Sequence, residues 1–164
     1  MIRFKEVDLL SAEMKDCLDL DVIINKNEWP NSPASMMATP IIYSQMGNEN
    51  TVKTLTIYEG ETLIGITQWV YFTKETPPFP ANSYRLRSVL IDLTYQNKGY
   101  EEKVLMALVT ELMNKENSNV KSIYAVYQVE NKQAQMLYEA VGFQESELTW
   151  EDNEDTDVIV ELVI

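Results

Sequence analysis

The alternation of apolar and polar residues predicts strands separated by turns and helices. "TVKTLTIYEGETLIGITQWVYF" (residues 51–72) indicates two strands that are joined at Glu59-Gly60. "SYRLRSVLIDL" (83–93) alternates at first and becomes continuously apolar at Val89 to Ile91, so we expect its second half to be buried on both faces. Further strands are expected at residues 2–7 and 119–129 and in a last hairpin of residues 143–150 and 156–164.

Two helices are expected before residue 50. Ser11 suits an N-cap position for a helix that runs to about Asn27. Pro33 suits the first position of a second helix that runs to Gly47. Pro40 lies inside this second helix, and we expect it to kink or divide the helix.

Two more helices are expected in the second half of the chain, where apolar residues recur every three or four positions. The helix at about residues 100–115 carries its apolar face on Val104, Leu105, Leu108, Val109, Leu112 and Met113. The helix at 131–142 ends at Gly142, with Phe143 folding back over its last turn.

This order of elements predicts one α/β domain over residues 1–164. We find no repeat, low-complexity segment or linker, and 164 residues suit a single domain with a full core. The segment 73–82 holds three prolines and is expected to be a loop, because proline cannot donate to a central strand.

The charge and composition narrow the classes of function. The net charge of −13 disfavours nucleic acid and favours cationic partners. The chain has no histidine, which excludes a Ser-His-Asp triad and any metal site built on histidine, and we expect no metal. A single cysteine, Cys17, fits a reducing cytoplasm, and no run of about 18 apolar residues predicts a membrane span.

The stretch "YQNKGYEEKVL" (95–105) lies between a predicted strand and a predicted helix. Backbone N–H groups at a helix start, together with a glycine that allows close approach, are typical of a site for a phosphate group. The two carboxylates of Glu101 and Glu102 lie where the phosphate is expected. A βα turn without a ligand is the alternative interpretation of this stretch alone.

A second motif follows one strand later. "NKQAQMLYEAVGF" (131–143) has the order N-x-x-A-x-x-L-Y-x-x-x-G-F. In this order, the two motifs resemble the GNAT N-acetyltransferase superfamily over roughly residues 50–145. The resemblance implies an α/β (α+β) GNAT fold, with a mixed and mostly antiparallel central sheet, flanked by helices, in which two parallel strands, 85–93 and 120–128, splay apart.

The resemblance also implies a cosubstrate, a set of site residues and an oligomeric state. Acetyl-coenzyme A is expected between the splayed strands, and Tyr138 is expected near the thioester sulfur as the general acid. Homodimers are common in the family, so we expect a homodimer, with the apolar last strand as a candidate to pair across the interface. The residues implied to bind acetyl-CoA are Leu90, Ile91 and Asp92 through their backbone, Gln96, Asn97, Lys98, Gly99, Tyr100, Glu101 and Glu102 in the loop, and Asn131 from the other side.

The chain departs from the family pattern in two places. Glu101 occupies the last position of the loop motif, where glycine or alanine is usual. Many relatives also carry a glutamate base on the strand before the loop, whereas here Arg87 and Ser88 are nearest to that position. Asp92, Glu28 and Glu75 are candidate substitutes for the base.

The first half of the chain loosely resembles bacterial spermine/spermidine acetyltransferases, which implies a small polyamine as the amine acceptor. Glu28, Trp29 and Glu75 are the candidate substrate-binding residues. Asp19 and Asp21 are further candidates for attracting a polycation, and Trp69 and Tyr71 are either faces for an ammonium group or core residues. The alternatives are a GNAT enzyme for another amine (an amino acid, an aminoglycoside or a protein N-terminus) and a GNAT-fold binding module without catalysis.

Overall fold

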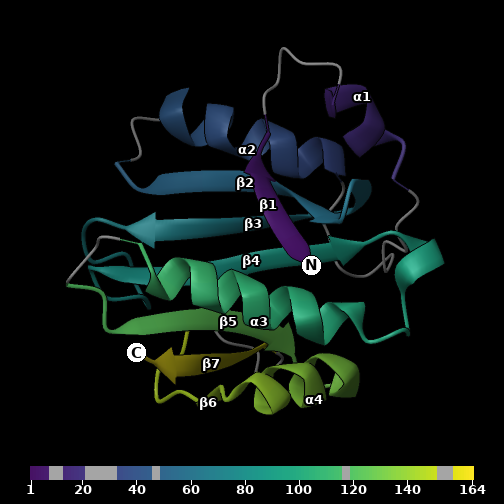
Figure 1. Ribbon diagram of the computed structural model, residues 1–164. Coiled ribbons are helices and arrows are strands. Elements are labelled where there is room, and N and C mark those ends of the chain that lie inside the picture. Colours follow the sequence, from purple (N-terminus) through teal and green to yellow (C-terminus); the bar gives the residue numbers. More distant parts are fainter. Residues whose placement is uncertain (8–12, 21–32, 46–48, 116–118, 151–156) are drawn as a thin grey trace.

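A seven-stranded sheet forms the centre of the computed structural model, in the order β1-β2-β3-β4-β5-β7-β6 (Figure 1). The structure describes residues 1–7, 13–20, 33–45, 49–115, 119–150 and 157–164. The strands are β1 (Ile2–Glu6), β2 (Thr51–Glu59), β3 (Thr62–Phe72), β4 (Ser83–Ile91), β5 (Ser122–Gln128), β6 (Gln144–Glu145) and β7 (Asp157–Val163). The helices are α1 (Glu13–Leu18), α2 (Pro33–Gln45), the short 3₁₀ helix η1 (Leu93–Tyr95), α3 (Tyr100–Met113) and α4 (Lys132–Val141).

The pairing of the strands confirms the predicted mixed, mostly antiparallel sheet. The strands β1 to β4 form an antiparallel meander, and β5 pairs with β7 antiparallel along its whole length. The central strands β4 and β5 are parallel, but they pair only at Tyr84 with Ile123 and at Arg85 with Tyr124. Beyond these two residue pairs the strands separate, as the expected splay requires.

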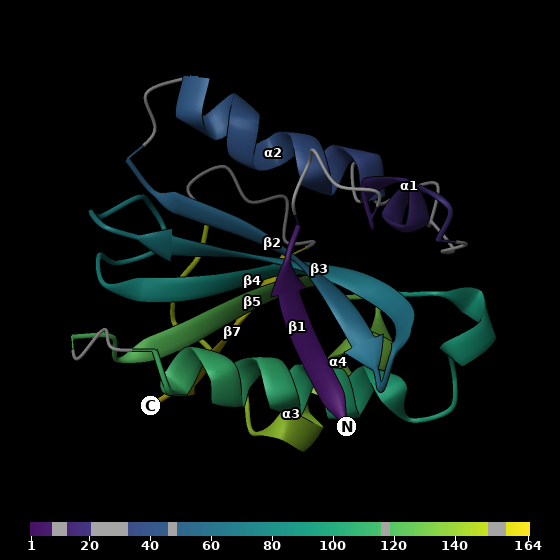
Figure 2. The ribbon, with the colours of Figure 1, turned by 45° about the horizontal axis from the view of Figure 1, so that its top comes forward.

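Helices cover both faces of the sheet. Figure 2 shows α1 and α2 on one face and α3 and α4 on the other. On the α3 face, the core joins Leu105 and Leu108 of α3 to Tyr84 and Leu86 of β4, and Tyr138 of α4 packs against it. On the α2 face, Met36 and Met37 pack against Ile66 of β3. Successive residues of a strand face opposite sides, so β4 sends alternate side chains to the two cores.

Three details of the sequence predictions are wrong. The first helix ends at Leu18, because Asp19 and Leu20 are not helical, and residues 21–27 lie outside the described residues. The helix α2 continues through Pro40, so the predicted division is wrong. The Met113 side chain is 53% exposed instead of packing in the core, because it lies at the last residue of α3, past the buried face that Leu112 completes.

The burial of β4 also differs from the prediction. Val89 and Leu90 are only half-buried, and the most buried residues lie in the first half of the strand. The reason is the separation from β5, which leaves one edge of the second half of β4 without a neighbouring strand.

The apolar last strand β7 lies inside the sheet. It pairs with β5 on one side, and Val160 and Glu161 pair with the short strand β6 on the other. The predicted antiparallel pairing of the last two strands is therefore present, but the first of these strands ends at Glu145 and not at Trp150. Within the described parts of the chain, no helix combines the length and apolar character needed to cross a membrane.

Candidate active site

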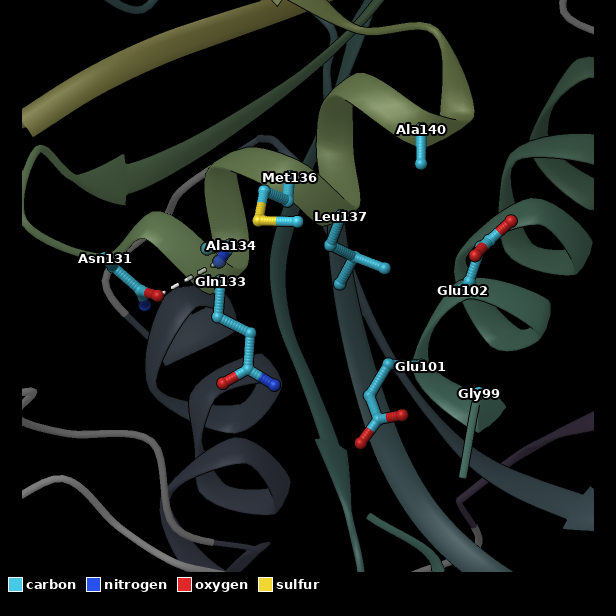
Figure 3. A pocket seen from close by; sticks show the side chains of 9 residues that line it. All are labelled: Gly99, Glu101, Glu102, Asn131, Gln133, Ala134, Met136, Leu137 and Ala140. Carbon is cyan, nitrogen blue, oxygen red and sulfur yellow. Dashed lines mark hydrogen bonds between the residues drawn. The ribbon is translucent and has the colours of Figure 1, made fainter. Parts of the chain in front are cut away.

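The start of α3 and one side of α4 enclose a cleft of about 450 Å³, which we call the helix cleft. Figure 3 shows Glu101 and Glu102 reaching into it from α3, opposite Met136 and Leu137 of α4. The full lining is Gly99, Glu101, Glu102, Asn131, Gln133, Ala134, Met136, Leu137 and Ala140. The two sequence motifs, which are about thirty residues apart along the chain, thus meet in one cleft.

The start of α3 has the geometry of an anion-binding helix end. Gly99 is the N-cap, with φ 76° in the left-handed region, and no side chain caps the helix there. The first N–H groups of a helix have no intrahelical acceptor, and the helix dipole favours a negative charge beside them. A Cβ at Gly99 would meet no atom within 4 Å, so glycine is needed here for its backbone conformation and not for space.

The loop before α3 is held together by its own side chains. The Gln96 side chain donates to the carbonyl of Ile91 at 2.7 Å, and Lys98 donates to the carbonyl of Thr94 at 2.6 Å. The Asp92 carboxylate caps η1 by accepting the N–H of Thr94 at 2.9 Å. Gln96 and Asp92 therefore shape the loop through local hydrogen bonds, a role that the sequence motif alone did not indicate.

Glu101 turns back toward the loop. Its carboxylate accepts the backbone N–H of Asn97 at 3.1 Å, and Asn97 itself has a left-handed φ of 57°. Among the N–H groups of the loop, that of Asn97 is thus already bonded to a negative oxygen. Glu102 is exposed in the first turn of the same helix.

The start of α4 is fixed by Asn131. Its side-chain oxygen accepts the N–H of Ala134 at 3.0 Å, so Asn131 is the N-cap of α4 as well as a residue of the helix cleft. The helix ends at Gly142, whose φ of 102° allows its N–H to bond back to Tyr138 and Glu139. These two caps set the position of Tyr138.

Tyr138 faces the sheet instead of lining the helix cleft. Its ring stacks on Tyr127 of β5 at a centroid distance of 6.1 Å and meets the edge of Phe143 at 5.3 Å. Burial raises the pKa of Tyr138 to about 12, and the positive charge of Arg85 offsets part of that rise. The phenol therefore stays protonated at neutral pH and has no hydrogen-bond partner among the described residues.

The substrate residues expected from the sequence are only partly described. Glu28, Trp29 and Asp21 lie outside the described residues. Glu75 is exposed and lines a cavity of about 540 Å³, which we call the outer cavity, together with Glu147 and Trp150. Trp69 and Tyr71 pack against Tyr84 in the α3-face core, so they are core residues and not faces for a ligand.

The structure adds residues that the motifs did not single out. Gln133, Met136 and Ala140 line the helix cleft from α4. The helical spacing of three and four residues between them is the signal that places them on one face. Within the described parts, no group of three or more acidic, cysteine or histidine residues could hold a metal ion.

Comparisons with solved structures agree with this fold. The spermidine N-acetyltransferase of Vibrio cholerae, solved with CoA and spermine, superposes with a TM-score of 0.66 at 17% identity, covering 99% of this chain and 95% of that one. The aminoglycoside acetyltransferase AAC(6')-Ib, solved with coenzyme A, gives a TM-score of 0.72 at 16% identity over 99% and 95%. An acetyltransferase of Thermus thermophilus gives a TM-score of 0.64 at 15% identity over 100% and 97%.

These three similarities concern the fold. No curated protein matches the chain by sequence. The profile of the acetyltransferase (GNAT) family matches residues 16–143, which include both motifs and the two central parallel strands. The chain therefore belongs to the acetyltransferase (GNAT) family and is an acyl-CoA-dependent N-acetyltransferase.

Proposed function

We propose that the chain transfers an acetyl group from acetyl-CoA to a primary amine by direct attack in a ternary complex. One observation carries this proposal: β4 and β5 pair at only two positions and then separate, and Tyr138 packs against Tyr127 of β5. Burial raises the pKa of Tyr138, which keeps its phenol protonated. A protonated phenol at this place suits the donation of a proton to a leaving thiolate.

The described residues fit acetyl-CoA. Gly99, the uncapped start of α3 and Asn131 face one another across a cleft, which suits a pyrophosphate and its neighbouring groups. When bound, acetyl-CoA supplies an activated thioester. The residues that we propose to hold it are the backbone of Leu90, Ile91 and Asp92, the loop residues Gln96, Asn97, Lys98, Gly99, Tyr100, Glu101 and Glu102, and Asn131.

The acceptor must lose a proton before it can attack. An alkyl ammonium has a pKa near 10.4, so only about one molecule in ~10³ is neutral at pH 7 and a base or water chain is needed. Asp92 already caps η1. Of the three candidate bases, Glu28 lies outside the described residues, so we propose Glu75, which lines the outer cavity.

A small polyamine is our first candidate for the acceptor. The net charge of −13 attracts polycations, and Glu75 and Glu147 bring two carboxylates to the outer cavity. The fold similarity to a spermidine acetyltransferase supports this candidate. Glu28 and Trp29, the other candidates for binding the amine, lie outside the described residues. A homodimer in the cytoplasm, without nucleic acid or membrane partners, is part of the same proposal.

A thiol-release assay with acetyl-CoA and a panel of amines tests the proposal. We expect turnover with at least one primary amine and a mass increase of one acetyl group on that amine. The panel holds spermidine, spermine, lysine, glutamine and an aminoglycoside, with a tertiary amine as the control that cannot form a stable amide. Binding of acetyl-CoA without release of thiol for any amine would contradict the proposal.

A further inference from the structure

Two of the three arginines of this acidic chain line one small cavity on the face of the sheet opposite α3 and α4. This cavity, which we call the arginine cavity, has a volume of about 130 Å³. Arg85 and Arg87 come from β4, Val70 from the neighbouring strand β3, Asn50 from the residue before β2, and Phe79 and Trp150 from two loops. The arginine cavity thus gathers positive charge in a chain whose net charge is −13.

The backbone of β4 directs both arginines to the same cavity. Gln68 pairs with Ser88 and Trp69 with Leu86, which leaves Arg87 as the extra residue of a bulge. Bulges bend a strand and re-aim its side chains, and they are common beside active sites. Arg85, two residues earlier, faces away from the core that Tyr84 and Leu86 enter.

The Arg85 guanidinium packs against two aromatic rings that also contact each other. Its central carbon lies 5.0 Å from the centroid of Phe79 and 5.5 Å from that of Trp150. The two rings also meet edge to face at 5.6 Å. A guanidinium fixed in this way keeps a defined plane, and its fork of donors matches the two oxygens of a carboxylate.

The arginine cavity lies next to the reacting centre. Arg85 occupies the last of the two residue pairs that join β4 to β5, directly before the strands separate. Burial raises the pKa of Tyr138, and the charge of Arg85 lowers it by a smaller amount. Arg85 and Tyr138 therefore influence each other across the sheet. The arginine cavity also shares Pro77 and Trp150 with the outer cavity, which contains Glu75 and Glu147.

We infer that the amine acceptor carries a carboxylate, which Arg85 and Arg87 bind in the arginine cavity. The acceptor class is then an amino acid or a similar zwitterion, with the carboxylate on β4 and the amine directed to the gap between β4 and β5. Glu75 and Glu147 suit a second, cationic group of such an acceptor. This inference rests on the proposed acetyl transfer and selects among its acceptors, against the polyamine candidate.

Two matched pairs of amines test the inference. Cadaverine is lysine without its carboxylate, and putrescine is ornithine without its carboxylate. We expect kcat/KM to be about tenfold or more higher for at least one amino acid than for its decarboxylated partner, the range of a charged hydrogen bond. The inference would be overturned if kcat/KM for each diamine equalled or exceeded that for its amino acid, or if spermidine had a higher kcat/KM than all four compounds. Either result would leave the proposed acetyl transfer intact.

Substitution of one arginine gives a second test. Arg87→Gln is expected to raise KM for the preferred amino acid about tenfold or more and to leave the diamine almost unchanged. Arg3→Gln removes the same charge from an exposed arginine of β1 and should alter neither. Equal losses for amino acid and diamine would show that Arg87 has a purely structural role.

A binding measurement separates the two proposals if no amine is turned over. Calorimetry of lysine and of cadaverine with the protein and CoA then reports recognition without chemistry. Binding of lysine that Arg87→Gln abolishes would support the carboxylate site while contradicting acetyl transfer. Absence of lysine binding would overturn the inference. An unchanged dissociation constant for acetyl-CoA shows that the variant is folded.

Discussion

The two faces of the sheet build their proposed sites in different ways. The helix cleft on the α3 and α4 face comes from one stretch of chain, Gly99 to Ala140, in which α3 begins without a side-chain cap and α4 begins at the cap Asn131. The arginine cavity on the other face joins Asn50, the β3–β4 loop, β4 and Trp150. The two sequence motifs accordingly mark the first face, whereas the second is built from segments far apart in the sequence.

The charges on the two faces are the reverse of what their proposed ligands suggest. Glu101 and Glu102 line the cleft proposed for a polyanionic cosubstrate, whereas Arg85 and Arg87 line the cavity beside the proposed amine site. Local geometry resolves the contrast on the first face, since backbone N–H groups and a helix dipole attract phosphate in spite of nearby carboxylates. On the second face, the arginines set the choice of acceptor.

The largest expected effect on turnover is that of a substitution at Tyr138, which packs against Tyr127 of β5. Tyr138→Phe keeps both ring contacts and removes only the phenol oxygen, so we expect a turnover about 10²-fold lower with an unchanged dissociation constant for acetyl-CoA. Steady-state rates at saturating amine and calorimetry measure the two quantities. The control Tyr127→Phe changes the neighbouring ring in the same way. An unchanged rate for Tyr138→Phe would remove the phenol from the mechanism.

A smaller effect is expected at Glu101. Its carboxylate occupies the N–H of Asn97, and a charge at ~5 Å from a phosphate costs at most about 3 kcal/mol at an effective dielectric of ~20. Exposure lowers that cost, so we expect Glu101→Gly to tighten acetyl-CoA binding about fivefold or more, or roughly 1 kcal/mol. The control Glu102→Gly makes the same change one residue later. Equal dissociation constants for wild type and Glu101→Gly at fixed salt would show that this carboxylate does not oppose the phosphates.

Salt dependence sharpens the contrast in charge. If a polyamine is the acceptor, its KM should rise a few-fold between low and moderate salt, because screening weakens its attraction to a chain of net charge −13. A zwitterionic amino acid has a smaller net charge and should show a smaller change. KM values for spermidine and lysine at several ionic strengths check this difference. If salt does not change the KM for spermidine, the net charge of the chain has no part in substrate choice.

The last prediction is that the rate at saturating substrate does not change at alkaline pH. Burial raises the pKa of Tyr138 to about 12, so the phenol keeps its proton below that pH and loses it only as the pH rises through about 12. The rate at saturating substrate should therefore not fall between pH 8 and pH 10 through loss of the acid. A fall with a midpoint near 10, which the Phe variant lacks, would show that the phenol titrates at its ordinary pKa.

Most of the fold is determined by the sequence alone, since local patterns encode local environments. Spacings of three and four residues fix the buried face of α3 at Val104, Leu105, Leu108, Val109 and Leu112. Asn131 and Gly142 mark the two ends of α4, because a side-chain acceptor and a left-handed glycine are needed at those positions. The two motifs predicted which residues line much of the helix cleft before their contacts were known.

Only the tertiary structure decided which distant segments meet. The sequence predicts that Val89 and Leu90 are buried on both faces, yet they are only half-buried because β4 and β5 separate beside them. The apolar pattern within one strand does not depend on the distance to the neighbouring strand. Trp69 and Tyr71 enter the core because β3 pairs with β4 in one register. Arg85 meets Phe79 of the β3–β4 loop and Trp150, which lies after β6. Contacts between residues far apart in sequence depend on the packing of whole elements, so the charge of the proposed acceptor site became visible only in three dimensions.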